Sequence, residues 1–171
     1  MDELNRLSVD DFKKQKKTPI ILVLDNVRSL NNVGSIFRTA DAFLVEAIYL
    51  CGITATPPHR EIQKTALGAT ESVDWKHFEH VEDAIKELKA NEFKIISVEQ
   101  VENPVYLNEF KPDKNAKYAI VLGNEVEGVN QKVIQQSDYC IEVPQFGTKH
   151  SINVSVCAGI LVWDLFVKMK Y

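Results

Sequence analysis

Asparagine, glycine and arginine are spaced along residues 26–38 as a ligand site at the start of a helix would require. Asn31 or Asn32 is a good N-cap for such a helix. Gly34 and Arg38 are four residues apart and therefore share one helix face, and the glycine would leave room for a ligand one turn below the guanidinium. The alternative is an ordinary arginine that is solvated or ion-paired.

A second segment, residues 123–128, has a glycine at each end and the carboxylate of Glu125 between them. Two glycines just past an apolar strand suggest a tight turn whose backbone must approach something closely. The segment is not a P-loop, because the Gly-Lys-Ser/Thr ending that holds phosphate and magnesium is missing, and the chain has no glycine fingerprint of a dinucleotide fold. A plain turn with a capping acid is the open alternative.

Ser151, Asn153 and Ser155 form a third polar group, directly before an apolar helix. Backbone N–H groups and small polar side chains at a helix start can satisfy a ligand, and simple capping explains only one of the three residues. His77 and His80 are the one arrangement that hints at metal. Because no third ligand lies near them in the sequence, we expect no metal site.

The elements that must position these segments alternate along the chain. Strands are predicted at residues 20–24, 47–51, 93–98, 118–122 and 139–143, and helices at residues 33–43, 60–67, 81–91, 131–137 and 153–168. This alternation predicts an α/β fold, with a mostly parallel sheet and helices on both faces. Each polar segment follows a predicted strand, and open α/β sheets bind ligands at the carboxyl ends of their strands.

The last predicted helix is apolar around most of its circumference, so we expect it to be buried on more than one side. Its apolar residues are Ile160, Leu161, Val162, Trp163, Leu165, Phe166 and Val167. A central core helix and a core helix that also forms a subunit interface fit this pattern equally well.

The composition limits the class of protein. Of the 171 residues 45% are hydrophobic, yet no run approaches the length of a membrane span and the charged amino terminus lacks the apolar core of a secretion signal, so one cytoplasmic globular domain is expected. Three cysteines, odd in number and far apart in apolar surroundings, favour reduced core thiols: Cys51, Cys140 and Cys157.

The net charge of −4 argues against a protein that coats nucleic acid, so any such site must be local. The basic candidates are Lys13, Lys14, Lys16, Lys17, Arg28, Arg38, Arg60, Lys64, Lys149 and His150. The lysine run near the amino terminus also fits a solvated face.

Taken together, the three segments resemble the motifs of the SpoU/TrmH family of RNA ribose methyltransferases, part of the SPOUT superfamily. Residues 32–38 are similar to the family's first motif, residues 123–128 to its second, and residues 144–155 to its third. The resemblance covers residues 20–166. Within the family, residues 95–100 and 123–125 are most similar to the branch that methylates a tRNA guanosine.

The resemblance implies a methyltransferase domain over residues 19–171, preceded by a short helical segment at residues 1–18. The carboxyl-terminal part of the domain would thread through a loop as a trefoil knot, which general topology rules disfavour and only the family suggests. It also implies a homodimer and S-adenosylmethionine as the cofactor, bound in bent form against the knot. The implied binding residues are Val98, Leu122, Gly123, Ile141, Pro144, Ser151 and Ile152.

The implied reaction is methyl transfer to the 2′-hydroxyl of a ribose in RNA. That hydroxyl is a poor nucleophile, so transfer needs in-line positioning and help with the hydroxyl proton. The family assigns this help to Arg38. Because a guanidinium holds its proton, we favour stabilisation of the developing alkoxide over a base role aided by a phosphate. The remaining implied residues are Asn32 and Glu125 as orienting groups, Ser151 and Asn153 at the reacting centre, and Arg28, Arg38, Arg60 and Lys64 on the RNA.

Some features depart from the family pattern. Family members often carry an extra RNA-binding domain or basic terminal helices, whereas about eighteen residues precede the first predicted strand here, so we expect a weak grip on RNA. Ile152 replaces the usual leucine, and Cys157 a smaller residue. Two alternatives stay open beside the tRNA enzyme: a ribosomal RNA 2′-O-methyltransferase, and a non-catalytic RNA-binding protein of the same fold. A nucleotide-binding regulator is a third and weaker alternative.

Overall fold

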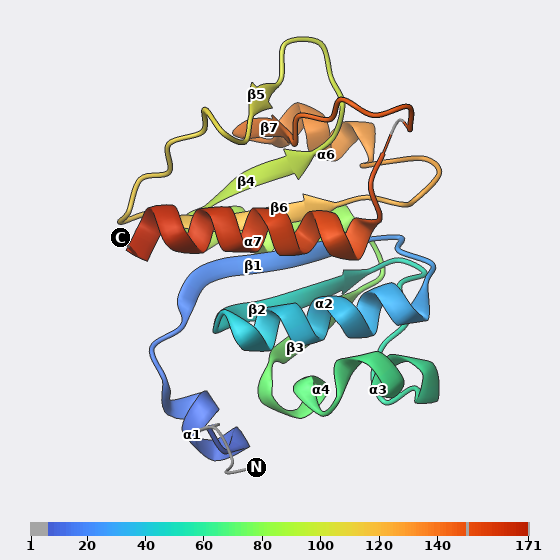
Figure 1. Ribbon diagram of the computed structural model, residues 1–171, viewed down its shortest axis with the longest axis vertical. Coiled ribbons are helices and arrows are strands. Elements are labelled where there is room, and N and C mark those ends of the chain that lie inside the picture. Colours follow the sequence, from blue (N-terminus) through green and yellow to red (C-terminus); the bar gives the residue numbers. More distant parts are fainter. Residues whose placement is uncertain (1–6, 150, 171) are drawn as a thin grey trace.

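A computed structural model describes residues 7–149 and 151–170 (Figure 1). His150, one of the basic candidates, and the first six residues of the amino-terminal segment lie outside the described residues. Seven strands form one sheet in the order β3-β2-β1-β6-β4-β7-β5, and every pairing between neighbours is parallel. The expected α/β fold with a parallel sheet is therefore confirmed.

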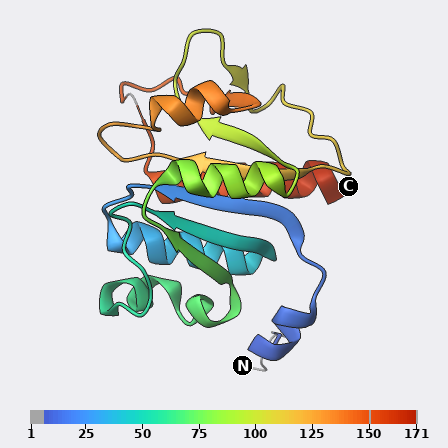
Figure 2. The ribbon, with the colours of Figure 1, turned by 180° about the vertical axis from the view of Figure 1, so that it is seen from behind.

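The strands are β1 (Thr18–Asp25), β2 (Val45–Cys51), β3 (Asp74–Phe78), β4 (Phe93–Val98), β5 (Val105–Tyr106), β6 (Lys117–Leu122) and β7 (Tyr139–Glu142). The helices are α1 (Val9–Lys14), α2 (Leu30–Ala42), α3 (Arg60–Ala66), α4 (Ala69–Ser72), α5 (Val81–Ala90), α6 (Gln131–Gln136) and α7 (Val154–Lys170). Helices α2 and α7 cover one face of the sheet (Figure 1), and α5 and α6 cover the other (Figure 2).

The sequence did not predict β3, β5 or α4. Strand β3 is an edge strand that pairs only with β2, and most of its side chains are exposed, so it lacks the apolar run of a central strand. Strand β5 has two residues and α4 has four, which is too short for a periodic pattern.

The start of α2 also differs from the prediction. Helix α2 begins at Leu30, three residues before the predicted start, and its N-cap is Ser29, whose Oγ accepts a hydrogen bond from the backbone N–H of Asn32 at 3.3 Å. Asn31 and Asn32 therefore lie inside the first turn, and neither is the N-cap. Serine and asparagine are comparable N-caps, so residue type alone could not separate the candidates.

The core lies on both faces of the sheet because side chains alternate along each strand. Leu22 and Leu24 of β1 pack into the cluster beneath α2 and α7, whereas Ile21 and Val23 pack into the cluster beneath α5 and α6. Strands covered on both faces read as continuous apolar runs, which explains why the central strands were predicted correctly.

Helix α7 is buried on one side only within the described chain, so the expectation of burial on several sides was wrong for the single chain. Its buried residues are Ala158, Leu161, Val162 and Leu165, all on one face. The opposite face exposes Val156, Ile160 and Trp163 by 53%, 38% and 55%. An apolar sequence pattern identifies hydrophobic side chains but cannot show whether the same chain covers them.

Among the described residues, none of the helices has the length and apolar character that a membrane span requires.

Candidate functional site

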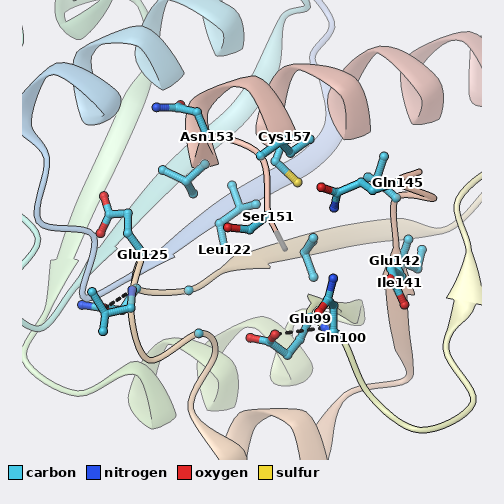
Figure 3. A pocket seen from close by; sticks show the side chains of 18 residues that line it. Glu99, Gln100, Leu122, Glu125, Ile141, Glu142, Gln145, Ser151, Asn153 and Cys157 are labelled. Carbon is cyan, nitrogen blue, oxygen red and sulfur yellow. Dashed lines mark hydrogen bonds between the residues drawn. The ribbon is translucent and has the colours of Figure 1, made fainter. Parts of the chain in front are cut away.

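The second and third polar segments line a cavity of about 410 Å³ at one end of the sheet, and hydrogen bonds join the first segment to them (Figure 3). The cavity lies beyond the carboxyl ends of β4, β6 and β7, which are neighbours in the sheet. Register brings the strand ends together, because Val98 at the end of β4 lies beside Leu122 of β6 and Ile141 of β7. These three apolar residues line the cavity, as expected for a ligand at this edge of an open α/β sheet.

The second segment is a tight turn closed by its own backbone. Asn124 and Gly128 exchange two hydrogen bonds, from Asn124 N to Gly128 O at 3.0 Å and from Gly128 N to Asn124 O at 2.9 Å. A Cβ on Gly123 would lie 2.2 Å from the carbonyl carbon of Gly128, so only glycine fits there. The close approach that the glycines predicted is thus between the two ends of the turn itself.

Asn124 fixes this turn to the first segment. The residue is 6% exposed, and its Oδ1 accepts hydrogen bonds from Val126 N at 2.8 Å and Glu127 N at 3.0 Å. Its Nδ2 donates to the backbone oxygen of Asn26 at 2.9 Å, directly after β1. One buried amide therefore shapes the turn and joins it to the loop that leads into α2.

Glu99 supports the turn from the β4 side of the cavity. Its Oε2 accepts a hydrogen bond from Val129 N at 2.9 Å, and its Oε1 accepts one from Gln100 N at 2.9 Å. Gly128 has a φ of +73°, and a Cβ there would lie 2.1 Å from Glu99 Oε2. The turn therefore needs glycine at position 128 for two reasons, its left-handed backbone and the adjacent carboxylate.

Glu125 connects the second segment to the first. Its carboxylate accepts hydrogen bonds from Arg28 N at 3.2 Å, Ser29 N at 3.4 Å and Asn32 Nδ2 at 3.3 Å. Partial burial acts to raise the pKa of Glu125, but hydrogen bonds from its own backbone N–H and from the loop outweigh burial and hold the pKa below its usual value. Glu125 is thus an anion that orders the loop before α2.

Asn153 brings in the third segment. Its Nδ2 donates to Asn32 Oδ1 at 3.2 Å, and its Oδ1 accepts from Ser155 N at 2.9 Å, which is the geometry of a helix cap for α7. Asn32, Glu125 and Asn153, one from each segment, therefore form a continuous hydrogen-bonded chain at the rim of the cavity. In Figure 3 Asn153 lies at the start of α7, Cys157 projects from α7, and Glu125 lies on another side of the cavity.

Eight of the residues expected to bind cofactor or substrate line the cavity: Val98, Leu122, Gly123, Glu125, Ile141, Ser151, Ile152 and Asn153. Asn32 joins them through its hydrogen bonds. Pro144 does not line the cavity, although its neighbours Val143 and Gln145 do. Arg38 is exposed on α2 and makes no hydrogen bond or ion pair with any described residue, so a single chain does not bring it into this group.

Gly34 serves helix packing, and the expected space for a ligand beside it is filled. A Cβ on Gly34 would lie 2.1 Å from Thr65 Oγ1 and 2.3 Å from the backbone oxygen of Ile62, both on α3. Thr65 Oγ1 also donates a hydrogen bond to Asn31 O at 3.0 Å. The sequence interpretation was wrong because the same glycine that admits a ligand also admits a second helix.

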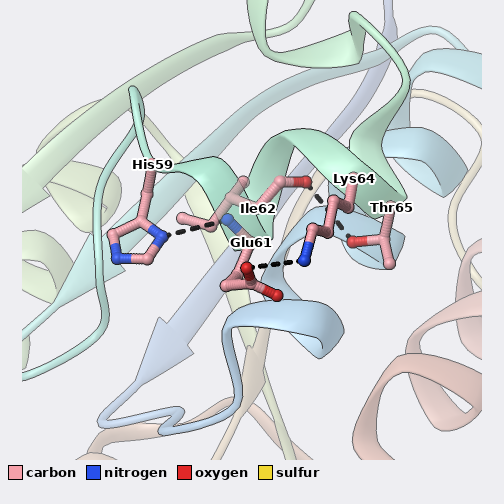
Figure 4. Close-up of polar contacts among 5 residues, drawn as sticks. All are labelled: His59, Glu61, Ile62, Lys64 and Thr65. Atoms are coloured by element: carbon pink, nitrogen blue, oxygen red, sulfur yellow. Dashed lines mark hydrogen bonds and ion pairs between the residues drawn. The ribbon is translucent and has the colours of Figure 1, made fainter.

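The basic candidates on α3, Arg60 and Lys64, are exposed, and Figure 4 shows Lys64 together with its neighbours Glu61 and Thr65. Lys64 Nζ forms an ion pair with Glu61 Oε1 at 2.7 Å, and His59 Nδ1 accepts a hydrogen bond from Glu61 N at 3.2 Å. Arg60 makes no ion pair with any described residue. Arg28 takes part in the site through its backbone N–H, and its side chain is exposed.

Several cavity residues were not assigned to the site from the sequence. They are Glu99, Gln100, Asn124, Val126, Gly128, Glu142, Val143, Gln145, Val154 and Cys157. Glu99 and Gln100 could have been found because they directly follow β4, at the same edge as the other segments. Burial raises the pKa of the Cys157 thiol to about 11, so the side chain facing the cavity is uncharged at neutral pH.

No group of three or more His, Cys, Asp or Glu side chains could hold a metal ion within residues 7–149 and 151–170. The two histidines that hinted at metal lie near the end of the β2–β3 pairing and at the start of α5, and the His80 side chain makes no cap hydrogen bond. His77 Nε2 lies 3.0 Å from the backbone oxygen of Gly52, and His80 is the N-cap residue of α5.

Comparison with known proteins adds the family. The model of the SpoU rRNA Methylase family matches residues 19–163. A Staphylococcus saprophyticus protein, provisionally named a TrmH family tRNA/rRNA methyltransferase, is 30% identical over 159 residues, covering 93% of this chain and 63% of that protein. A Borreliella burgdorferi protein, named an uncharacterised tRNA/rRNA methyltransferase, is 31% identical over 92% of this chain and 67% of its own length. The chain thus spans less than two thirds of the staphylococcal relatives it matches.

Two solved structures show the fold. The A. aeolicus TrmH/SpoU tRNA modifying enzyme superposes with a TM-score of 0.81 at 24% identity, covering 93% of this chain and 79% of that one. An AdoMet-bound rRNA methyltransferase from Sinorhizobium meliloti superposes with a TM-score of 0.80 at 23% identity, covering 90% and 58%. The expected knot fold is confirmed by these matches, and the chain belongs to the SpoU methylase family.

Proposed function

We propose that this chain transfers a methyl group from S-adenosylmethionine to the 2′-hydroxyl of a ribose in RNA. The observation that carries the proposal is the cavity lined by the second and third family segments, to which Asn32 of the first segment is joined by hydrogen bonds with Glu125 and Asn153. A cavity of about 410 Å³ suits a ligand of the donor's size. Two relatives of the same fold, the S. meliloti enzyme and AviRb of Streptomyces viridochromogenes, bind AdoMet.

In this proposal the apolar strand ends Val98, Leu122 and Ile141 pack against the adenosine, and the glycine turn supplies backbone groups. The remaining contacts expected from the family come from Gly123, Ser151 and Ile152. Pro144 is proposed to contribute by shaping the backbone of its neighbours Val143 and Gln145, which line the cavity. The donor carries an activated sulfonium, so the protein's task is to position it and to exclude water. The uncharged Cys157 thiol suits a wall that must not compete as a nucleophile.

Arg38 is proposed to stabilise the negative charge that develops on the ribose oxygen and to hold a neighbouring phosphate. Asn32 and Glu125 position the start of α2, and Ser151 and Asn153 line the reacting centre. Because Arg38 is exposed and lies outside the cavity of its own chain, we propose that it serves a site completed by a second copy.

The apolar outer face of α7 supports a twofold homodimer. Val156, Ile160 and Trp163 follow one another at helical spacing and are all exposed. The Trp163 ring packs against Phe43, the C-cap residue of α2, with ring centroids 5.6 Å apart. An exposed apolar stripe of this kind is typical of a surface that a second subunit buries. Light scattering tests it: an active monomer of 19.4 kDa at micromolar concentration would refute both the dimer and the shared site.

The proposed substrate is the ribose of a guanosine in tRNA, because residues 95–100 and 123–125 are most similar to that branch. Arg28, Arg60 and Lys64 are the proposed RNA contacts beside Arg38. The family's solved structures include enzymes named for tRNA and for rRNA, so ribosomal RNA is the second candidate. Incubation with labelled donor and separate tRNA and ribosomal RNA pools distinguishes them, and label in ribosomal RNA alone would overturn the tRNA assignment.

Calorimetry tests the first step of the proposed function, which is binding of the methyl donor. We expect binding of S-adenosylmethionine and S-adenosylhomocysteine, and much weaker binding of NAD and ATP.

Arg38→Ala should keep donor binding and lose at least about a hundredfold in the rate of methyl transfer, the typical effect of removing a key electrostatic donor. Arg38→Lys should fare little better, because an ammonium cannot reproduce a planar fork. A folded protein that binds neither donor nor product would favour a non-catalytic RNA-binding role.

A further inference from the structure

Two large apolar side chains are more exposed than any others among the described residues. Phe146 is 98% exposed and Val126 is 81% exposed, whereas the next, Leu67, is 66% exposed. Both stand on segments that border the same cavity. Val126 lies in the glycine turn and lines the cavity, and Phe146 lies between the lining residues Gln145 and Ser151.

The Phe146 ring is not part of the cavity lining and is almost fully exposed to solvent. Ile141, Glu142, Val143 and Gln145 line the cavity, but Phe146, the next residue, does not. The residues that follow form an exposed tip, and a Cβ on Gly147 would meet no atom within 4 Å. Nothing in the described chain therefore packs against this ring.

The setting of the ring points to a nucleobase. If a ribose enters the mouth of the cavity, the base on that ribose or the base of the adjacent nucleotide lies within one nucleotide's length of the cavity rim. Unpaired RNA bases are commonly stacked on aromatic side chains, and such stacking tolerates any base because each has a π-face. Lys149 is exposed on the same tip, where an ammonium can contact the phosphate of that nucleotide.

We propose that Phe146 is a stacking platform for an unpaired RNA base next to the methylated ribose. The proposal rests on the proposed function for its ligand, RNA. It assigns Phe146 a role in substrate positioning and none in binding the donor, since the ring lies outside the cavity.

The test compares variants that differ in stacking alone. Phe146→Ala should weaken binding of an unmodified tRNA pool by about five- to 150-fold, the range corresponding to roughly 1–3 kcal/mol per stacked base. Phe146→Leu, apolar but not flat, should resemble Phe146→Ala, and Phe146→Trp should bind like the wild type. Tyr106→Ala, at an exposed aromatic on β5 outside the cavity lining, is the matched control and should change nothing. Loss in the control, or full binding by Phe146→Ala, would overturn the proposal.

Fluorescence identifies what occupies the platform. In Phe146→Trp, RNA should quench the added indole, compared with a wild-type titration that contains only Trp75 and Trp163. Quenching by S-adenosylhomocysteine alone would assign the ring to the donor's adenine, and a signal that changes only with protein concentration would assign it to a second copy; both overturn the proposal. Calorimetric donor binding by wild type and Phe146→Ala should be equal. If the wild type binds no donor, the proposed function fails while the RNA titration still decides the stacking.

Discussion

Asn153 donates a hydrogen bond from its Nδ2 to the Oδ1 of Asn32 at 3.2 Å, across 121 positions of the sequence. The Oδ1 of the same Asn153 accepts hydrogen bonds from Ser155 N at 2.9 Å and Val156 N at 3.4 Å. One side chain therefore caps α7 and also holds the first turn of α2, so the amide group of asparagine has two separable roles.

Replacement of Asn153 by aspartate separates these roles. A carboxylate still caps α7, but it cannot donate to Asn32 Oδ1, and the Asn32 amide cannot simply flip because its Nδ2 is bonded to Glu125. We expect Asn153→Asp to keep wild-type stability and to lose about tenfold or more in methyl transfer. Asn153→Ala should lose the cap as well, about 0.5–2 kcal/mol in the free energy of unfolding. Denaturant unfolding and single-turnover rates measure the two effects.

Asn32→Ala provides the control for this link. If the hydrogen bond between the two asparagines carries the rate effect, Asn32→Ala combined with Asn153→Asp should be little slower than the slower single variant, because neighbours that act as a unit are not additive. Fully multiplicative losses would show that the two side chains act independently.

The order of the elements in the sequence predicts which strand ends lie together at the edge of the sheet where the cavity is found. Val98, Leu122 and Ile141 end apolar runs, and parallel strands align their carboxyl ends, so the cavity floor follows from the order of elements. The hydrogen bonds among Asn32, Glu125 and Asn153 required the fold, since a link between residues 121 positions apart leaves no local pattern.

The wrong interpretations of Gly34 and of α7 have a common physical origin. A small residue such as Gly34, or an apolar run as in α7, indicates close packing but does not indicate which group packs there. The partner of Gly34 is α3, and the outer face of α7 stays partly exposed at Val156, Ile160 and Trp163. The knot was predicted only through resemblance to a family, because hydrophobic periodicity carries no information on the order in which a chain threads.

Gly128→Ala should disable donor binding while Gly147→Ala should not. Position 128 has a φ of +73° and its Cβ would lie 2.1 Å from Glu99 Oε2, so alanine must displace Glu99 and distort the turn. Position 147 has free space around its Cβ. We expect at least about a tenfold loss of S-adenosylhomocysteine affinity for Gly128→Ala, since one strained contact of this type costs about 1–3 kcal/mol. Calorimetry measures the affinity of both variants for S-adenosylhomocysteine. Equal affinities of Gly128→Ala and Gly147→Ala would contradict the proposal that the turn shapes the donor site.

Cys157 should react slowly with iodoacetamide at neutral pH and should be protected by the donor. Burial raises its pKa from 9.0 to about 11, and the thiolate is the reactive form, so the rate should rise about tenfold per pH unit until the pH approaches that pKa. S-adenosylhomocysteine should slow the reaction because Cys157 lines the cavity. Mass spectrometry resolves Cys157 from Cys140, which lies outside the cavity lining and serves as the internal control. Rapid alkylation at pH 7, or no protection by the product, would contradict the assignment.

Arg60→Gln should reduce the salt dependence of RNA binding more than Lys64→Gln. Both side chains are exposed on α3, but Lys64 Nζ is held by Glu61 Oε1 at 2.7 Å, whereas Arg60 has no ion pair among the described residues. A cation that contacts a phosphate releases counterions, and each such contact adds about 0.7–0.9 to the slope of log affinity against log salt. We therefore expect Arg60→Gln to lower that slope by about this amount and Lys64→Gln to lower it by less, because Lys64 must leave Glu61 before it can bind a phosphate.

Fluorescence anisotropy with labelled tRNA over a series of potassium chloride concentrations measures the slopes. Glu61→Gln is the matched control: freed from its partner, Lys64 should then raise the slope, and an unchanged slope in all three variants would place the RNA elsewhere than α3.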